Sequence, residues 1–392
     1  GLYKIKGQKI FITFGEHDLT DNIVHLVLAR TPGAPEGTRG ISLFLVPKYR
    51  LDDAGNPTIS NGVHCASIEH KLGIHGSPTA VMVYGEGEDC LGEIVGDEMG
   101  GMKAMFVMMN NARLMVGCQG VQIAERATQQ AQRYAAERVQ SSLAGSADRT
   151  PVTIEHHPDV KRMLWRMRAQ TEAARALIYY ASAQTDFGKL GDEAAALRAE
   201  VLIPLAKAHA TDIGCEVASL GVQVHGGMGF IEETGAAQHY RDARIAPIYE
   251  GTNGIQAADL VGRKLGMAGG EGVRSLLADI THGAAGHPEL ADLAAACTAV
   301  TDWLEQANAP DRLAGSYPYL TMLATATCGW LMAVEQQGAR AALDAGEGDT
   351  AFLEAKIAST RFYLQQIVPA ATGLAPSALA GDAALEPLPR LG

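Results

Sequence analysis

The hydrophobic pattern of this chain changes its period once, near residue 98, and that change limits the folds open to it. Residues 2–95 hold short apolar and β-branched runs such as KIFITF and GISLFLV, separated by clusters of Gly, Pro, Asn and Asp. Such runs without helices between them predict antiparallel strands in a small barrel or sandwich. We therefore predict an α+β protein whose β-rich domain covers residues 1–98.

Residues 99–265 instead repeat apolar side chains at i, i+3, i+4 and i+7, the spacing of amphipathic helices. One helix of about forty residues, two more long helices and a fourth piece at 254–265 predict a four-helix bundle over residues 99–268. A Gly-rich break precedes an Ala-rich stretch, helical to about residue 370 and followed by a Pro-bearing tail. We assign this C-terminal helical extension to residues 269–392.

Composition and charge exclude several classes of function. The formal net charge is −12 and the Lys and Arg residues are scattered, which argues against a nucleic-acid surface. The six cysteines form no C-x-x-C pair and have no His at metal-ligand spacing, so we predict buried thiols, no metal site and a reducing, cytoplasmic compartment. The uncharged run 313–334 contains Pro and Gly, which favours a buried helix over a transmembrane segment.

The segment IYEGTNGIQ contains a single carboxylate, Glu250, which is the most distinctive candidate for chemistry. A Gly-Thr-Asn-Gly run follows it and should open a helix, with Thr252 or Asn253 as the N-cap. Free N–H groups at a helix start bind anions or a developing oxyanion, and the apolar residues before Glu250 would partly desolvate its carboxylate for use as a general base. The alternative is a carboxylate that only interacts with the helix dipole.

Three further features have alternative interpretations. The segment QVHGGMGF at 223–230 would let backbone approach a ligand closely, or it is a helix end followed by turns. Arg241 and Arg244 would bind an anionic ligand, or they form salt bridges. The Met-rich run at 99–109 would line an apolar pocket, or it packs in the core.

Together these stretches resemble the acyl-CoA dehydrogenase family. GQKIFITFGEHD (7–18) is similar to the family's strand against the flavin, and RLMVGCQGVQIAERATQQAQRYAAERV (113–139) to its first bundle helix. QVHGGMGF is similar to its adenine-side loop, and RDARIAPIYEGTNGIQ (241–256) to its catalytic segment. The resemblance runs in order over residues 1–265, and the catalytic segment is its most specific part.

The resemblance implies a reaction and a set of site residues. Glu250 would remove the α proton of an acyl-CoA thioester while the β hydrogen leaves as hydride to FAD, giving a trans-2-enoyl-CoA. The main-chain N–H of Glu250 and a flavin hydroxyl would hold the thioester oxygen. The positions that match FAD contacts are Phe11, Thr13, Arg138, Gln223, Gly227, Thr252 and Asn253. Arg113 and Gly251 match substrate positions.

The same resemblance implies partners. Arg138, Gln223 and Gly227 would reach the FAD of a neighbouring subunit, so we expect a homodimer or a dimer of dimers. Electrons would pass to an electron-transfer flavoprotein. Two alternatives share the fold: an acyl-CoA oxidase that uses oxygen, and a non-catalytic binding or assembly subunit, against which the complete IYEGTNGIQ segment argues.

The ends of the chain add two expectations. The sequence opens GLYKIKG without an initiator Met, so we expect a fragment that lacks the family's N-terminal helical domain. The extension after residue 270 is similar to that of a bacterial subgroup that includes 3-methylthiopropanoyl-CoA dehydrogenases. That thioester is therefore the candidate substrate.

Overall fold

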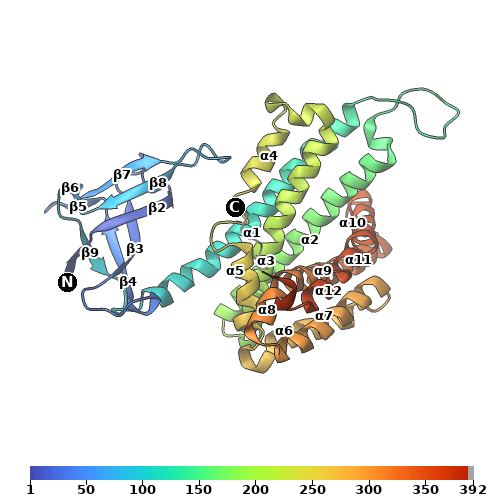
Figure 1. Ribbon diagram of the computed structural model, residues 1–392. Helices are drawn as coiled ribbons and strands as arrows, with labels where there is room; N and C mark the ends of the chain where they lie inside the picture. Colours follow the sequence, from blue (N-terminus) through green and yellow to red (C-terminus); the bar gives the residue numbers. More distant parts are fainter. Residues whose placement is uncertain (387–392) are drawn as a thin grey trace. The chain divides into compact units, whose positions relative to one another are not determined.

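The computed structural model describes residues 1–386, and the chain divides into two compact units, Gly1–Asn111 and Ala112–Gly392 (Figure 1). The first unit contains all the strands among the described residues, and the second is helical. This confirms the predicted α+β class. The further boundary predicted near residue 268, inside the second unit, stays a prediction.

The first unit is a sandwich of antiparallel sheets. One sheet has the strand order β1-β9-β4-β3, the other β2-β8-β7, and β5 and β6 form a separate ribbon. The strands are β1 Leu2–Lys4, β2 Gly7–Thr13, β3 Val24–Arg30, β4 Ile41–Pro47, β5 Tyr49–Leu51, β6 Pro57–Ser60, β7 Val63–Ile68, β8 Thr79–Tyr84 and β9 Leu91–Ile94. Phe44 and Val46 from the first sheet and Ala80 and Met82 from the second are buried in one core. Because both sheets contribute to this core, the β-rich domain is a sandwich, one of the two forms predicted from the sequence.

Three long helices form the frame of the second unit. They are α1 Gly101–Glu137, which begins in the first unit, α2 Pro158–Lys189 and α3 Glu193–His225. The carboxylate of Asp192 caps α3 by accepting a 2.9 Å hydrogen bond from the N–H of Ala195. Helix α5, Asn253–Asp259, continues through a π-helical turn at Leu260–Lys264 and packs against α3 as the short fourth member of the predicted bundle.

One helix of the second unit was not expected from the sequence. Between α3 and α5 the chain forms α4, Ala236–Ala243, which packs against α3. Two short 3₁₀ turns, Gly226–Phe230 and Glu232–Thr234, connect α3 to it. The glycine-rich stretch is therefore a helix end followed by turns, and α4 stands between those turns and Glu250.

The C-terminal helices share a hydrophobic core with the bundle (Figure 1). They are α6 Glu271–Gly283, α7 Pro288–Gln306, α8 Ala309–Ala314, α9 Ser316–Ala345, α10 Thr350–Phe362, α11 Val368–Thr372 and α12 Ala375–Leu379. Helix α9 contacts α2, α3 and α5, and its Leu320 and Leu323 are fully buried. The predicted Pro-bearing tail begins later than expected, after Leu379, and residues 387–392 lie outside the described residues.

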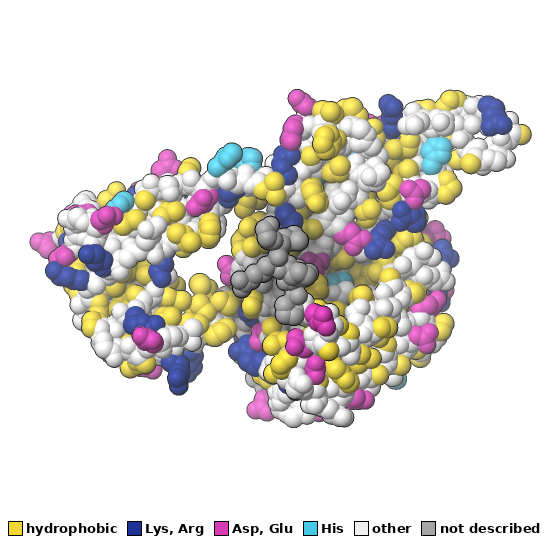
Figure 2. All heavy atoms as spheres, viewed as in Figure 1, with side chains coloured by type: hydrophobic (Ala, Val, Ile, Leu, Met, Phe, Trp, Pro, Cys, Tyr) yellow, Lys and Arg dark blue, Asp and Glu magenta, His cyan; other side chains and the backbone are white. Residues whose placement is uncertain are grey.

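The uncharged run 313–334 falls largely within α9, as a buried helix. Among residues 1–386, none of the helices combines the length and the apolar character that a membrane span requires. On the face shown in Figure 2, Lys and Arg side chains are dispersed among Asp and Glu and form no broad basic area. All six cysteines are free thiols, three of them buried.

Candidate active site

The loop before α5 places a carboxylate on strained backbone. Glu250 has a φ of 55° and Gly251 a φ of 82°, so two consecutive residues lie in the left-handed region. A side chain in that region costs about 1–2 kcal/mol, which is why glycine usually occupies it. Thr252 then caps α5 by accepting a 3.3 Å hydrogen bond from the N–H of Ile255. Of the two N-caps predicted from the sequence, Thr252 is the one observed.

Two side chains from the core hold this loop. Lys207, in the middle of α3, is fully buried and donates 2.8 Å hydrogen bonds to the carbonyl of Gly251 and to Oδ1 of Asn253. Burial lowers the pKa of Lys207 to about 8. The buried amide of Gln256 donates to the carbonyls of Gly251, at 3.2 Å, and Glu250, at 3.4 Å. Hydrogen bonds from side chains on two helices, α3 and α5, therefore hold the strained backbone in place.

Asn253 completes the attachment of the loop to α3. Its side chain is 4% exposed, and its Nδ2 donates to the carbonyl of Ala208 at 3.1 Å, the hydroxyl of Thr211 at 3.0 Å and Oδ1 of Asp212 at 2.9 Å. Burial raises the pKa of Asp212. The amide of Asn253 is thus fully engaged by the protein, and its predicted contact with FAD stays a prediction.

The carboxylate of Glu250 is left free by this arrangement. It is exposed, and among residues 1–386 no Lys, Arg or His lies within ion-pair distance of it. Its main-chain N–H likewise finds no acceptor within the described part of the chain. The neighbouring Tyr249 is half-buried, and its hydroxyl donates to Gln119 on α1, whereas Ile248 is 48% exposed. The partial desolvation expected for Glu250 is therefore not supplied by this unit alone.

Arg113 lies underneath the same loop. Its side chain is 3% exposed and Nη1 pairs with Asp259 at 3.3 Å, while Nη2 would lie 3.8 Å from a Cβ added to Gly251. Its Nε has no hydrogen-bond partner among the described residues. The structure brings two predicted substrate residues, Arg113 and Gly251, together beside Glu250, with the arginine already engaged by a carboxylate.

A cleft of about 340 Å³ opens beside the loop. Its lining residues come from α3, from the catalytic segment and from α9: Asp212, Cys215, Arg244, Pro247, Ile248, Thr252, Asn253, Gly254 and Tyr317. Arg244 is exposed in it, whereas Arg241 forms a 2.7 Å ion pair with Glu232. An anionic group that enters this cleft would therefore meet Arg244 and the hydroxyl of Thr252.

Three of the predicted FAD residues lie at the opposite end of the bundle. Arg138 follows α1, and Gln223 lies two residues before the end of α3. The two helix ends are in contact, since the rings of Tyr134 on α1 and His225 on α3 stack with their centroids 4.4 Å apart. Arg138, Gln223 and Gly227 are all exposed, and a Cβ on Gly227 would meet open space. Since α1 rises about 1.5 Å per residue, Arg138 lies on the order of 35 Å from Arg113. One FAD cannot be held by both ends of a single bundle unless it spans that distance.

The remaining predicted FAD residues, Phe11 and Thr13, lie on β2 in the first unit. The pairing of β2 with β8 shifts register between Lys9 and Ile12, and Phe11 has a φ of 58° with 67% of its side chain exposed. Thr13 is exposed as well. The strand thus presents an aromatic ring and a hydroxyl that the sheet does not use, which fits a planar, polar-edged ring system such as a flavin.

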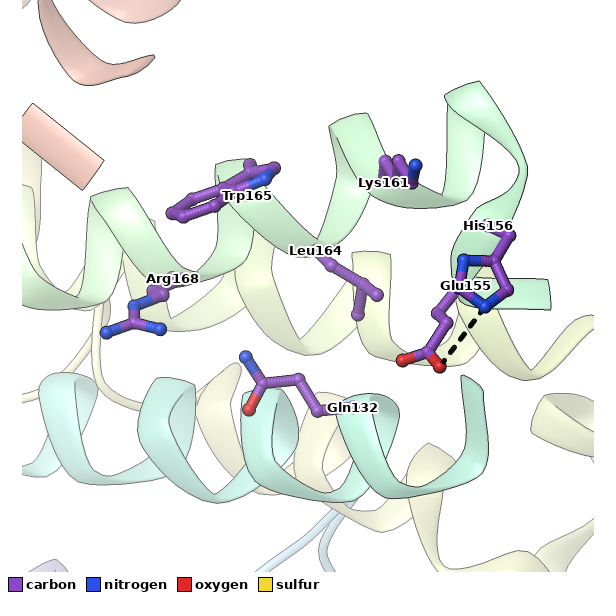
Figure 3. Close-up of a pocket in the computed structure, with 7 residues that line it drawn as sticks. All are labelled: Gln132, Glu155, His156, Lys161, Leu164, Trp165 and Arg168. Atoms are coloured by element: carbon purple, nitrogen blue, oxygen red, sulfur yellow. Dashed lines mark ion pairs between the residues drawn. The ribbon is translucent and has the colours of Figure 1, made fainter. Parts of the chain in front are cut away.

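A larger hollow of about 390 Å³ lies elsewhere, between α1 and the start of α2 (Figure 3). It is lined by Gln132, Glu155, His156, Lys161, Leu164, Trp165 and Arg168. Arg168 is paired with Glu172 at 3.0 Å, and Glu155 lies 3.9 Å from His156. It includes none of the predicted site residues, so size does not identify the active site here.

Sequence reasoning missed the residues that support the loop. Lys207, Asp212, Gln256 and Tyr317 were not singled out, although one signal was present. Lys207 is the lone charge in the run VLIPLAKAHA, where a cation must either be buried with partners or interrupt an apolar face. That signal indicates a buried lysine with a structural role, but it does not indicate which loop the lysine binds.

Comparison with known proteins identifies the family. The family model described as "Acyl-CoA dehydrogenase, C-terminal domain" matches residues 99–265, and "Acetyl-CoA dehydrogenase C-terminal like" matches residues 281–389. A butyryl-CoA dehydrogenase of Syntrophomonas wolfei is 36% identical over 97% of this chain and 67% of that protein. The chain belongs to the acyl-CoA dehydrogenase family. The resemblance seen in the catalytic segment is thereby confirmed.

Two further relatives refine the family assignment. A 3-methylmercaptopropionyl-CoA dehydrogenase of Ruegeria pomeroyi is 48% identical over 94% of this chain and 65% of that protein. The structure of an acyl-CoA dehydrogenase from Bacillus anthracis complexed with FAD matches with a TM-score of 0.76 at 22% identity, covering 100% of this chain and 68% of that chain. The latter shows a common fold. The chain spans about two thirds of the length of the curated relatives it matches.

Proposed function

We propose that this protein is an FAD-dependent oxidoreductase that converts an acyl-CoA thioester to a trans-2-enoyl-CoA, with Glu250 as the catalytic base. The observation that carries the proposal is the free carboxylate of Glu250 on a left-handed backbone anchored by Lys207 and Gln256. Backbone strain of this kind is concentrated at functional sites.

Different groups of the loop have different roles in the removal of the proton. The carboxylate of Glu250 takes the α proton, and the unpaired N–H of the same residue donates a hydrogen bond to the thioester oxygen as negative charge develops on that oxygen. Lys207 and Gln256 hold the two carbonyls that follow, so the N–H and the carboxylate keep their relative orientation. Gly251 adopts this left-handed backbone without the strain of a side chain, and we propose Gly251 and Arg113 as substrate-side residues.

The chain's surfaces fit FAD. When bound, FAD supplies the acceptor for the β hydrogen, which leaves as hydride as the C=C bond forms. Phe11 and Thr13 would contact its ring system, and Thr252 would contact it beside the base. Arg138 lies just beyond the end of α1, and Gln223 and Gly227 lie at the end of α3, on the order of 35 Å along the bundle from Arg113. We therefore propose that they bind the FAD of a second copy of this chain, in a homodimer or a dimer of dimers.

The substrate and the acceptor are proposed from the relatives. The 48% identity to the Ruegeria protein supports 3-methylthiopropanoyl-CoA, and the butyryl-CoA dehydrogenase supports a short acyl chain in general. Electrons would pass to an electron-transfer flavoprotein. Six free cysteines support a reducing, cytoplasmic location.

The deciding experiment is an anaerobic titration of the purified flavoprotein with 3-methylthiopropanoyl-CoA, butyryl-CoA and a medium-chain acyl-CoA, followed by visible absorbance. We expect the flavin band to bleach with one of the short thioesters. A flavin-bound protein that none of them reduces would contradict the proposed activity, and peroxide formed in air at the rate of turnover would assign an oxidase instead.

A further inference from the structure

A chain of hydrogen bonds links the C-terminal helices to the loop that contains Glu250. Tyr317, in the first turn of α9, donates a 2.5 Å hydrogen bond from its hydroxyl to Oδ2 of Asp212 on α3. The other oxygen of Asp212 accepts the 2.9 Å bond from Nδ2 of Asn253, the first residue of α5. Three helices that are far apart in the sequence therefore meet three residues after Glu250.

Each side chain in this hydrogen-bond network depends on the next one for a hydrogen-bond partner. Asp212 is largely enclosed, and burial raises its pKa, while the hydrogen bonds from Tyr317 and Asn253 oppose that rise. Asn253 connects Asp212 to the loop, because its Oδ1 accepts a 2.8 Å hydrogen bond from Lys207, and Lys207 also donates a 2.8 Å hydrogen bond to the carbonyl of Gly251. A shift of Asp212 would release an amide and a buried ammonium together.

The hydroxyl of Tyr317 is the part of this network that the bundle itself does not provide. It comes from the extension whose sequence matches the second family model, residues 281–389, and it lines the cleft beside Thr252 and Asn253. Tyr317 is 39% exposed, so its ring contributes less to the core than the neighbouring Tyr319, which is fully buried. The exchange of Tyr317 for Phe therefore tests the hydrogen bond and changes the packing little.

We propose that Tyr317 is a positioning residue through which the C-terminal extension fixes the backbone geometry of Glu250. This proposal rests on the proposed function, because it assigns the extension a role in orienting that base. Loss of the Tyr317 hydroxyl leaves Oδ2 of Asp212 without its hydrogen-bond donor. Asp212 is then held less firmly, and its hydrogen bond with Nδ2 of Asn253 weakens. The loop from Glu250 to Thr252 then samples backbone conformations that do not direct the carboxylate at the α carbon.

The test compares Tyr317→Phe with the wild-type protein in the flavin-loaded, full-length form. We expect the limiting rate constant of anaerobic flavin reduction by 3-methylthiopropanoyl-CoA to fall about tenfold, the effect of one hydrogen bond to a charged group, with half-saturation by substrate unchanged. Tyr179→Phe is the matched control, since Tyr179 is 63% exposed on α2 and has no hydrogen bond among the described residues.

A second measurement does not require turnover. Hydrogen–deuterium exchange should show faster exchange of the main-chain amide of Asn253, which donates 2.9 Å to the carbonyl of Pro247, with α2 unaffected. If the wild-type flavin is not reduced, the proposed function fails, whereas the exchange data still report on the link. Wild-type reduction and wild-type exchange in Tyr317→Phe would overturn the inference. So would a fall in Tm with faster exchange throughout α2 and α3, because that result indicates a general stabilising role.

Discussion

The ammonium of Lys207 donates a 2.8 Å hydrogen bond to the main-chain carbonyl of Gly251, from the centre of a helix that is buried on nearly every side. This contact attaches the loop that contains Glu250 to the core of the bundle. A strained, positive-φ backbone persists only where surrounding contacts hold it in place. Here hydrogen bonds from Lys207, Gln256 and Asn253, on two helices, hold the loop.

Replacing the proposed base should stop the chemistry and leave the protein intact. Glu250→Gln keeps the shape of the side chain and removes its basicity, so we expect flavin reduction to slow by at least about 10²-fold, within the range for general bases. The flavin-to-protein absorbance ratio should not change, because Glu250 is exposed and unpaired. Glu354→Gln, at an exposed position of α10, is the matched control. Reduction at the wild-type rate in Glu250→Gln would rule out this residue as the base.

Adding a single methyl group to the loop should disturb it. Gly251 has a φ of 82°, and a Cβ there would lie 2.8 Å from Nε2 of Gln256, the amide that holds the loop. We expect Gly251→Ala to lower the free energy of unfolding by about 1–2 kcal/mol and to slow flavin reduction. The control, Gly338→Ala, lies in α9 with open space around the added methyl and should stabilise the protein by up to about 1 kcal/mol. Equal unfolding midpoints for the two variants would contradict the strained geometry.

Loss of a cation at the far end of the bundle should release the cofactor. Arg138 is exposed beyond the end of α1 and is proposed to bind the pyrophosphate of a neighbouring subunit's FAD. We expect Arg138→Ala to weaken FAD retention about tenfold, as for one charge-assisted hydrogen bond. Flavin content after gel filtration measures this, with Arg133→Ala, an exposed arginine on the same helix, as the reference. Full flavin content in Arg138→Ala would place the pyrophosphate elsewhere.

Acid should destabilise the bundle through His209. Burial lowers the pKa of His209 from 6.5 to about 4, so below pH 6.5 the unfolded state binds more protons than the folded state. The free energy of unfolding should therefore fall as the pH decreases through this window, by about 3 kcal/mol in total. Urea unfolding near pH 7 and pH 5 should show a shallower loss for His209→Gln than for His282→Gln, whose histidine is exposed. Parallel losses in the two variants would show that His209 does not contribute.

The sequence predicted features that depend on neighbours in the chain. The alternation of strand residues, the long apolar repeats and the Gly-Thr-Asn-Gly run after Glu250 each reflect a local backbone preference, and each appears where it was expected. The left-handed conformation of Glu250 was not predicted, because glutamate rarely adopts it without tertiary support. Helix α4 was missed for a similar reason, since it is short and is stabilised by packing on α3.

The sequence by itself determined the strands of the first unit, the long helices of the second and the position of the candidate base, because spacing and residue chemistry act over a few residues. Tertiary structure decided which side chains hold that base. Lys207, Asp212 and Tyr317 are separated from Glu250 by about 40 to 70 residues, and each would be an ordinary helical residue if its segment stood alone. Their partners become fixed when α3, α5 and α9 pack together, since burial removes water and leaves each polar group dependent on the others.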